Sequence, residues 1–180
     1  MKKNVDYKWI LKIIIISFII SVTFSFISEM TIPNFNIVFG ITICLLFIVI
    51  GILFDMIGVS VTASDEGVFN SMASKKVRGA KLAVKFKKNA DKVSSFCNDV
   101  VGDICGIISG SAGAVIALRI SETTSINPLL ITLLITGLIS ALTIGGKALV
   151  KSTAIRNSNK ILHRFTLFLS IFYRTRWWYE

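Results

Sequence analysis

Four long apolar runs dominate the pattern of hydrophobic and polar positions along the chain. They lie at about residues 9–27, 37–61, 100–118 and 126–144. Each run approaches or exceeds the roughly 20 residues that an α-helix needs to cross about 30 Å of hydrocarbon. The pattern therefore predicts an all-α integral membrane protein with four transmembrane helices.

The first run has a basic start, Met1-Lys2-Lys3, like that of a cleaved signal peptide. Its apolar part is long, however, and residues 22–28 offer no small-x-small cleavage site. We therefore expect residues 1–34 to form a retained N-terminal membrane anchor helix.

Two polar segments also have an amphipathic pattern. The segment at about 69–96 is basic, and its apolar residues follow a near-helical spacing. That spacing predicts a juxtamembrane helical hairpin on the inner membrane surface, with its lysines toward lipid headgroups; a solvated hairpin that touches no lipid is the alternative. The tail at about 155–179 ends in Trp177-Trp178-Tyr179. Such rings favour the headgroup layer, so we expect an interfacial C-terminal helix.

The charges are distributed unevenly around these runs. The 180-residue chain has a net charge of +10. All of its 20 Lys and Arg residues except Arg119 lie before or at the start of the first run, between the second and third runs, or after the fourth run. The positive-inside rule then places both termini and the middle loop in the cytoplasm of a multi-pass cell-membrane protein.

The same charges and motifs exclude several classes of function. The basic loop has no interleaved stacking aromatics, so contact with anionic lipid explains the positive charge better than nucleic-acid binding. The chain has no H-E-x-x-H motif, no Walker loop, no dinucleotide fingerprint and no placeable Ser–His–Asp set. Asp99 and Asp103 lie on one predicted helix, whereas an aspartic protease dyad needs two converging groups. We expect no enzyme.

Asp99 and Asp103 stand at the entrance of the third run, four residues apart, and so on one helical face. Ionisable groups in a membrane span are costly and indicate function by default. The topology places further polar groups at the same depth, and their oxygens suit hard cations such as Mg²⁺ and Na⁺. They could equally mark the membrane boundary, and Lys147 could neutralise an aspartate directly.

Three motifs resemble the transmembrane domain of the CNNM/CorB family of magnesium and cobalt transport-associated proteins. They are VTASDEGVF at 61–69, SSFCNDVVGD at 94–103 and GGKALVKSTAIRN at 145–157, and RGAKLAVKF at 78–86 resembles the family's juxtamembrane helix. The resemblance implies a CorB-like domain over residues 35–180, without the family's cytoplasmic regulatory domains. It also implies a homodimer with a cytoplasm-facing cation site.

Carried over by motif, the resemblance implies ligands at Thr62, Ser64 and Asn98, with backbone oxygens near Gly145 and Gly146. The chain departs from the family in three respects. The family's exit glutamate aligns with Lys147, its exit proline aligns with Val150, and the cytoplasmic regulatory domains are not expected. The first apolar run is a further difference. Asp99 and Asp103 could compensate for the glutamate. The expected metal site therefore comprises Thr62, Ser64, Asn98, Asp99, Asp103, Gly145 and Gly146, with Lys147 as a substitute for the ion.

The sequence leads to two functional hypotheses. The first is transport or homeostasis of a divalent cation, with Mg²⁺ favoured, Co²⁺ as a further substrate and Na⁺ as a coupled ion. The second is a non-transporting membrane scaffold or regulatory partner in which Lys147 pairs with Asp103 instead of a bound ion. The expected partners are the lipid bilayer, a second copy of the chain and a separate cytoplasmic protein, and no cofactor is expected beyond Mg²⁺ or Na⁺.

Overall fold

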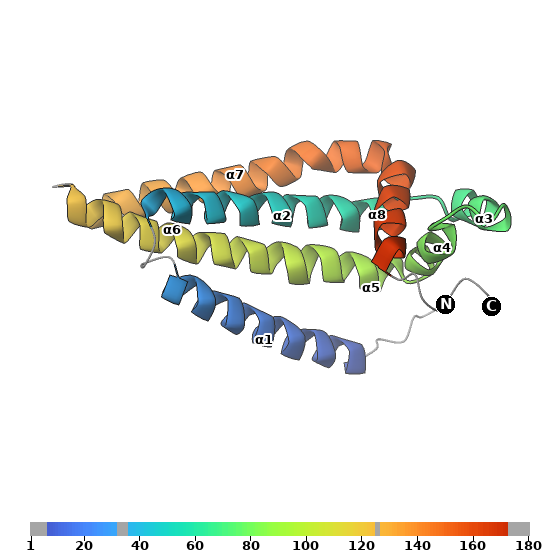
Figure 1. The fold of residues 1–180 in the computed structure, drawn as a ribbon, viewed down its shortest axis with the longest axis horizontal. Helices are drawn as coiled ribbons and strands as arrows, with labels where there is room; N and C mark the ends of the chain where they lie inside the picture. Colours follow the sequence, from blue (N-terminus) through green and yellow to red (C-terminus); the bar gives the residue numbers. More distant parts are fainter. Residues whose placement is uncertain (1–6, 32–35, 125–126, 173–180) are drawn as a thin grey trace. The chain divides into compact units, whose positions relative to one another are not determined.

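The computed structural model describes residues 7–31, 36–124 and 127–172. Every regular element within these ranges is a helix (Figure 1). In chain order the helices are α1 (Tyr7–Thr31), α2 (Ile37–Ala63), α3 (Glu66–Ser74), α4 (Ala80–Lys88), α5 (Ala90–Ser95), η2 (Phe96–Gly102), α6 (Asp103–Thr123), α7 (Pro128–Arg156) and α8 (Ser158–Phe172).

Four helical stretches of the described chain are long and apolar enough to cross a membrane: Tyr7–Ile27, Ile37–Ala63, Ala90–Thr123 and Pro128–Arg156. They coincide with the four apolar runs, so the prediction of an all-α protein with four such helices is confirmed. The last two extend beyond their runs, because α5, η2 and α6 follow one another without a break and α7 continues through Lys147 to Arg156. Lysine, alanine and leucine are strong helix formers, which explains why the polar residues there do not end the helix.

The chain divides into two compact units. One comprises Met1–Ile52 and Asp99–Gly146, and the other comprises Leu53–Asn98 and Lys147–Glu180. The domain boundary expected between residues 34 and 35 lies outside the described residues.

The first unit is held together by close packing of apolar helices. Cys44 and Ile48 of α2 are buried against Ala112 and Ile116 of α6, and a second cluster joins α6 and η2 to α1. Small residues allow the backbones to approach: a Cβ added at Gly51 would lie 3.1 Å from the Cβ of Cys105. Such small-residue contacts are typical of helix packing in membranes, where dispersion rather than water exclusion holds helices together.

The second unit has a core made by the end of α2, the hairpin helices and α8. Val61, Phe69, Ala83 and Leu162 are fully buried together. Helix α4 packs on α3 and on α8. Gly79 begins α4 with a φ of +81°, and a Cβ there would lie 3.0 Å from the backbone nitrogen of Leu167. The apolar face of the basic hairpin thus turns toward the core of its own unit.

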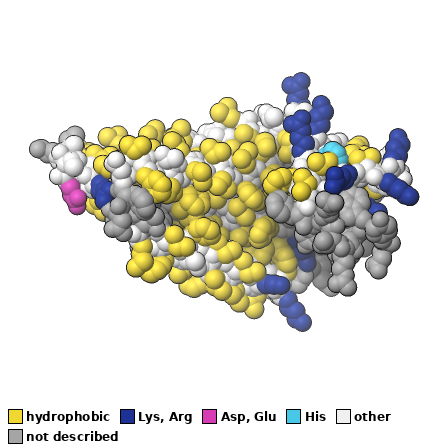
Figure 2. All heavy atoms as spheres, viewed as in Figure 1, with side chains coloured by type: hydrophobic (Ala, Val, Ile, Leu, Met, Phe, Trp, Pro, Cys, Tyr) yellow, Lys and Arg dark blue, Asp and Glu magenta, His cyan; other side chains and the backbone are white. Residues whose placement is uncertain are grey.

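Helix α8 buries one stripe of small and apolar side chains, spaced by four residues: Ser158, Leu162, Thr166 and Ser170. Elsewhere on this helix Leu167, Phe168 and Ile171 are exposed, and so are Lys160 and Arg164. Figure 2 shows Lys and Arg side chains beside hydrophobic ones on one face of the molecule. The three aromatic residues Trp177, Trp178 and Tyr179 lie outside the described residues.

Candidate functional site

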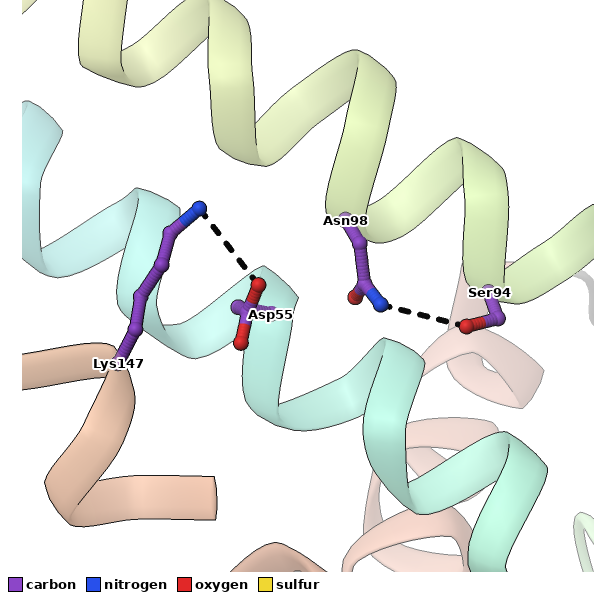
Figure 3. A network of polar contacts seen from close by, with 4 residues as sticks. All are labelled: Asp55, Ser94, Asn98 and Lys147. Carbon is purple, nitrogen blue, oxygen red and sulfur yellow. Dashed lines mark hydrogen bonds and ion pairs between the residues drawn. The ribbon is translucent and has the colours of Figure 1, made fainter. Parts of the chain in front are cut away.

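An ion pair joins α2 to α7 within the second unit. Nζ of Lys147 lies 3.6 Å from Oδ1 of Asp55, and their side chains are 25% and 16% exposed. Figure 3 shows the two side chains pointing toward one another from the two helices. Asp55 is the only charged residue in the sequence of α2, and Lys147 is the first in α7. Pairing offsets the cost of holding either charge among apolar neighbours.

Asn98 lies on η2, which is a π-helical segment between α5 and α6. Its amide nitrogen Nδ2 donates a hydrogen bond of 3.3 Å to Oγ of Ser94. Its Oδ1 is buried and has no hydrogen-bond partner among the described residues. Figure 3 shows the amide pointing from η2 toward α2.

Gly58 of α2 makes room for that amide. A Cβ at position 58 would overlap with Oδ1 of Asn98, so only glycine fits this approach without a shift of the asparagine. Gly58 follows Asp55 by three residues, about 4.5 Å along the helix and on nearly the same face. A buried acceptor without a partner costs about 1–3 kcal/mol. π-helical turns are enriched at functional sites. A buried oxygen without a partner in such a turn is a candidate position for a bound water or ion.

The end of α2 is already occupied by a cation of the protein. Nζ of Lys87 lies 2.7 Å from the carbonyl oxygen of Thr62 and 3.3 Å from that of Val61. An ammonium at a helix C-terminus satisfies free carbonyls and complements the helix dipole. The hydroxyls of the predicted ligands Thr62 and Ser64 donate to backbone oxygens of their own helix, at 2.9 Å and 3.0 Å. Their role as metal ligands stays a prediction.

The remaining predicted ligands belong to the first unit. Asp99 lies in η2 and Asp103 begins α6, and both are exposed. The helix expected across this pair is present, and its hydrogen-bonding pattern is π-helical from Phe96 through Gly102. Gly145 and Gly146 lie inside the continuous helix α7, where carbonyl oxygens accept helical hydrogen bonds. Gly146 packs against Ile52.

Sequence reasoning missed two of the residues that the structure brings together. Sequence reasoning did not anticipate the ion pair between Lys147 and Asp55, and its hypothesis that Lys147 pairs with Asp103 stays a prediction. Asp55 is the one charged residue in the sequence of α2, and this could have indicated that it needs a charged partner. Lys87 was one of eight basic residues in the middle loop, and its half-buried position on α4 only becomes visible in the fold.

The donor set is made of hard oxygens. Among the described residues no group of three or more His, Cys, Asp or Glu side chains could hold a metal ion. A cation bound here would therefore rely on amide and backbone oxygens, with Asp55 as the nearby carboxylate, and such oxygens suit Mg²⁺ better than softer metals. Cys44, Cys97 and Cys105 are buried, which agrees with a packing role.

Comparison with protein-family models, with curated proteins and with solved structures found no match for this chain. The likeness to the CNNM/CorB family therefore rests on the sequence motifs alone.

Proposed function

We propose that the chain is a membrane protein of divalent-cation transport or homeostasis, with Mg²⁺ as the favoured ion, Co²⁺ as a further one and Na⁺ as a coupled ion. The observation that carries the proposal is the buried, unpartnered Oδ1 of Asn98 in a π-helical turn of a candidate membrane span. A buried polar atom without a partner lowers the free energy of unfolding, and such unfavourable features are expected at functional sites.

Two further features support a cation rather than an anion at Asn98. The atom of Asn98 that lacks a partner is the amide oxygen Oδ1, and such an oxygen suits a cation. Asp55, three residues before Gly58, supplies the negative charge that a desolvated cation needs. The CNNM/CorB likeness extends the proposal to a homodimer with a CorB-like domain at 35–180.

The charge pattern supports a placement in the cell membrane with both termini cytoplasmic. In that orientation the second unit lies at the inner surface. Leu167, Phe168 and Ile171 of α8 are exposed on a helix that also exposes Lys160 and Arg164. This combination suits a helix at the interface of an anionic leaflet. The hairpin contributes exposed lysines rather than its apolar face.

Thermal unfolding of the purified protein in lipid nanodiscs tests the cation site. At a Mg²⁺ concentration about 100 times the dissociation constant, binding stabilises the folded state by about 2.7 kcal/mol, or roughly 5–10 °C for a chain of this size. Asn98→Ala removes this shift. Asn70→Ala, at an exposed position of α3, is the matched control and keeps it. A wild type that shows the same melting temperature in Mg²⁺ and in EDTA, at equal ionic strength, contradicts the proposal.

The second candidate is a non-transporting scaffold or regulatory partner, and the Lys147–Asp55 pair is the observation that favours it. A purely structural pair tolerates exchange of its charges. In a scaffold, Asp55→Lys combined with Lys147→Asp restores the stability that either single change removes, and no variant responds to Mg²⁺. A response to Mg²⁺ that depends on Asn98 excludes this candidate.

A further inference from the structure

The chain passes between its two compact units three times, and each passage lies inside a helix. The passages fall between residues 52 and 53 in α2, between 98 and 99 in η2, and between 146 and 147 in α7. Each unit also has an apolar core of its own, because two of the buried clusters lie in the first unit and the third lies in the second. Three helical backbones therefore connect two separately packed bodies.

Each passage coincides with a feature that weakens a helix against bending. Gly51 precedes Ile52 at the passage in α2, and the pair Gly145-Gly146 ends directly at the passage in α7. The passage in η2 lies inside the π-helical segment Phe96–Gly102. Glycine has no side chain to restrict its backbone, and sharp helix kinks occur at π-helical turns and at pairs of Gly or Ser. All three connections can therefore bend.

We propose that Gly51, the π-helical segment and Gly145-Gly146 form a hinge on which the second unit tilts as one body relative to the first. The inference goes beyond the proposed function and holds with or without a bound cation. Because the bends are confined to three short stretches of backbone, each unit keeps the contacts of its own core during the motion. A few residues that absorb the change in backbone angles are typical of hinge movements between packed bodies.

Polar contacts inside the second unit hold it together as a body. The hydroxyl of Ser158 donates a hydrogen bond of 3.4 Å to the carbonyl oxygen of Ala63. The backbone nitrogen of Asp65 donates one of 2.9 Å to Oδ1 of Asn159. With the ion pair between α2 and α7, these contacts join the end of α2 to α7 and α8. A tilt of α2 beyond Gly51 therefore carries the other two helices with it.

Pulsed electron paramagnetic resonance in lipid nanodiscs measures the tilt as the width of a distance distribution between two spin labels. The labels are attached to cysteines in a chain whose three native cysteines are changed to alanine. Leu134→Cys and Ser152→Cys lie at exposed positions of α7 on either side of the hinge, about 27 Å apart on a straight helix. Ile107→Cys and Glu122→Cys, at exposed positions of α6 within the first unit, are the reference pair. We expect the distribution across the hinge to be at least about twice as wide as the reference, because slow collective tilts are trapped as separate conformers on freezing.

One substitution in α7 tests the position of the hinge. Gly145→Ala restricts the backbone next to the passage, and no described atom lies within 4 Å of the added methyl group. We expect this change to narrow the distribution of the α7 pair toward the reference width. Gly137→Ala is the matched control, because it also lies between the two labels and in open space but away from the passage, and it should leave the width unchanged. Equal narrowing by both substitutions, or narrowing by neither, overturns a hinge at Gly145-Gly146.

A third pair of labels separates a tilt of the whole unit from bending of α7 alone. Ser71→Cys on α3 and Lys160→Cys on α8 lie at exposed positions within the second unit. A distribution for this pair as narrow as the reference, beside a wide one across the hinge, supports the tilt of one body. If this pair is as wide as the pair across the hinge, the second unit does not move as a body and the inference is wrong. A distribution across the hinge that is as narrow as the reference also overturns it. Neither result bears on Mg²⁺ binding, which the melting temperature tests separately.

Discussion

Gly58 is the residue on which the position of the Asn98 amide depends. Gly58→Ala places a Cβ where Oδ1 now lies, so the amide must move. We expect a loss of about 1–3 kcal/mol in the free energy of unfolding, as for other overpacked sites, and a loss of the Mg²⁺ response.

Gly137→Ala is the matched control, because no described atom lies within 4 Å of a Cβ added there. This second change should leave stability unchanged or raise it by up to about 1 kcal/mol, since alanine is the better helix former. Chemical or thermal unfolding in the same nanodiscs compares the two. Equal effects of the two substitutions would mean that the close approach at Gly58 has no structural role.

Lys87 links the hairpin to α2 at the scale of the elements. Lys87→Met removes the ammonium from the carbonyl oxygens of Val61 and Thr62. Hydrogen bonds to charged groups contribute about 1.5–3 kcal/mol, and the half-exposed position of Lys87 puts the expected loss near the lower end. Lys88→Met, next to it and exposed, should have little effect. A melting temperature that is equally low in both variants would assign the loss to net charge and not to the contact.

The four helices that are long and apolar enough to cross a membrane were the part of the fold that could be predicted from sequence. Long apolar runs leave few alternatives, because a chain inside a bilayer must satisfy its own backbone. The spacing of the apolar residues also predicted a juxtamembrane hairpin at about 69–96; helices lie in this segment, and their place at a membrane surface stays a prediction. The π-helical turn at Asn98 could not be predicted from sequence. A turn with one added residue leaves an almost wholly apolar run looking the same, and Asn98 packs against Gly58, a contact that is visible only in the fold.

The candidate site was predictable only in part for a related reason. The motif resemblance pointed to Asn98, and Lys147 stood out as a departure from the same motif, yet the contact of Lys147 with Asp55 depends on which faces of α2 and α7 meet. Sequence distance gives no information on that rotation. The contact of Lys87 with the end of α2 likewise depends on how the hairpin folds back onto its own unit.

The placement of the basic residues predicts the orientation of the molecule in the membrane, and cysteine labelling measures that orientation. Ser71→Cys lies on α3 of the hairpin, and Thr123→Cys lies at the end of α6, both at exposed positions. In intact cells a membrane-impermeant maleimide should label Thr123→Cys alone, and lysis should open Ser71→Cys to it. The three native cysteines are buried and give the background. Labelling of Ser71→Cys in intact cells would contradict the predicted topology and indicate the opposite orientation.

The central claim is that this chain binds and moves a divalent cation through a site at Asn98, and flux into liposomes tests it most directly. Purified wild type, Asn98→Ala and Asn70→Ala are reconstituted at equal density, and Mg²⁺ entry is followed with an internal fluorescent indicator under an imposed Mg²⁺ gradient, with and without a Na⁺ gradient. We expect uptake with the wild type and Asn70→Ala and none above empty liposomes with Asn98→Ala. Flat traces for the wild type across Mg²⁺, Co²⁺ and Na⁺ gradients, or equal uptake by all three proteins, would contradict the account.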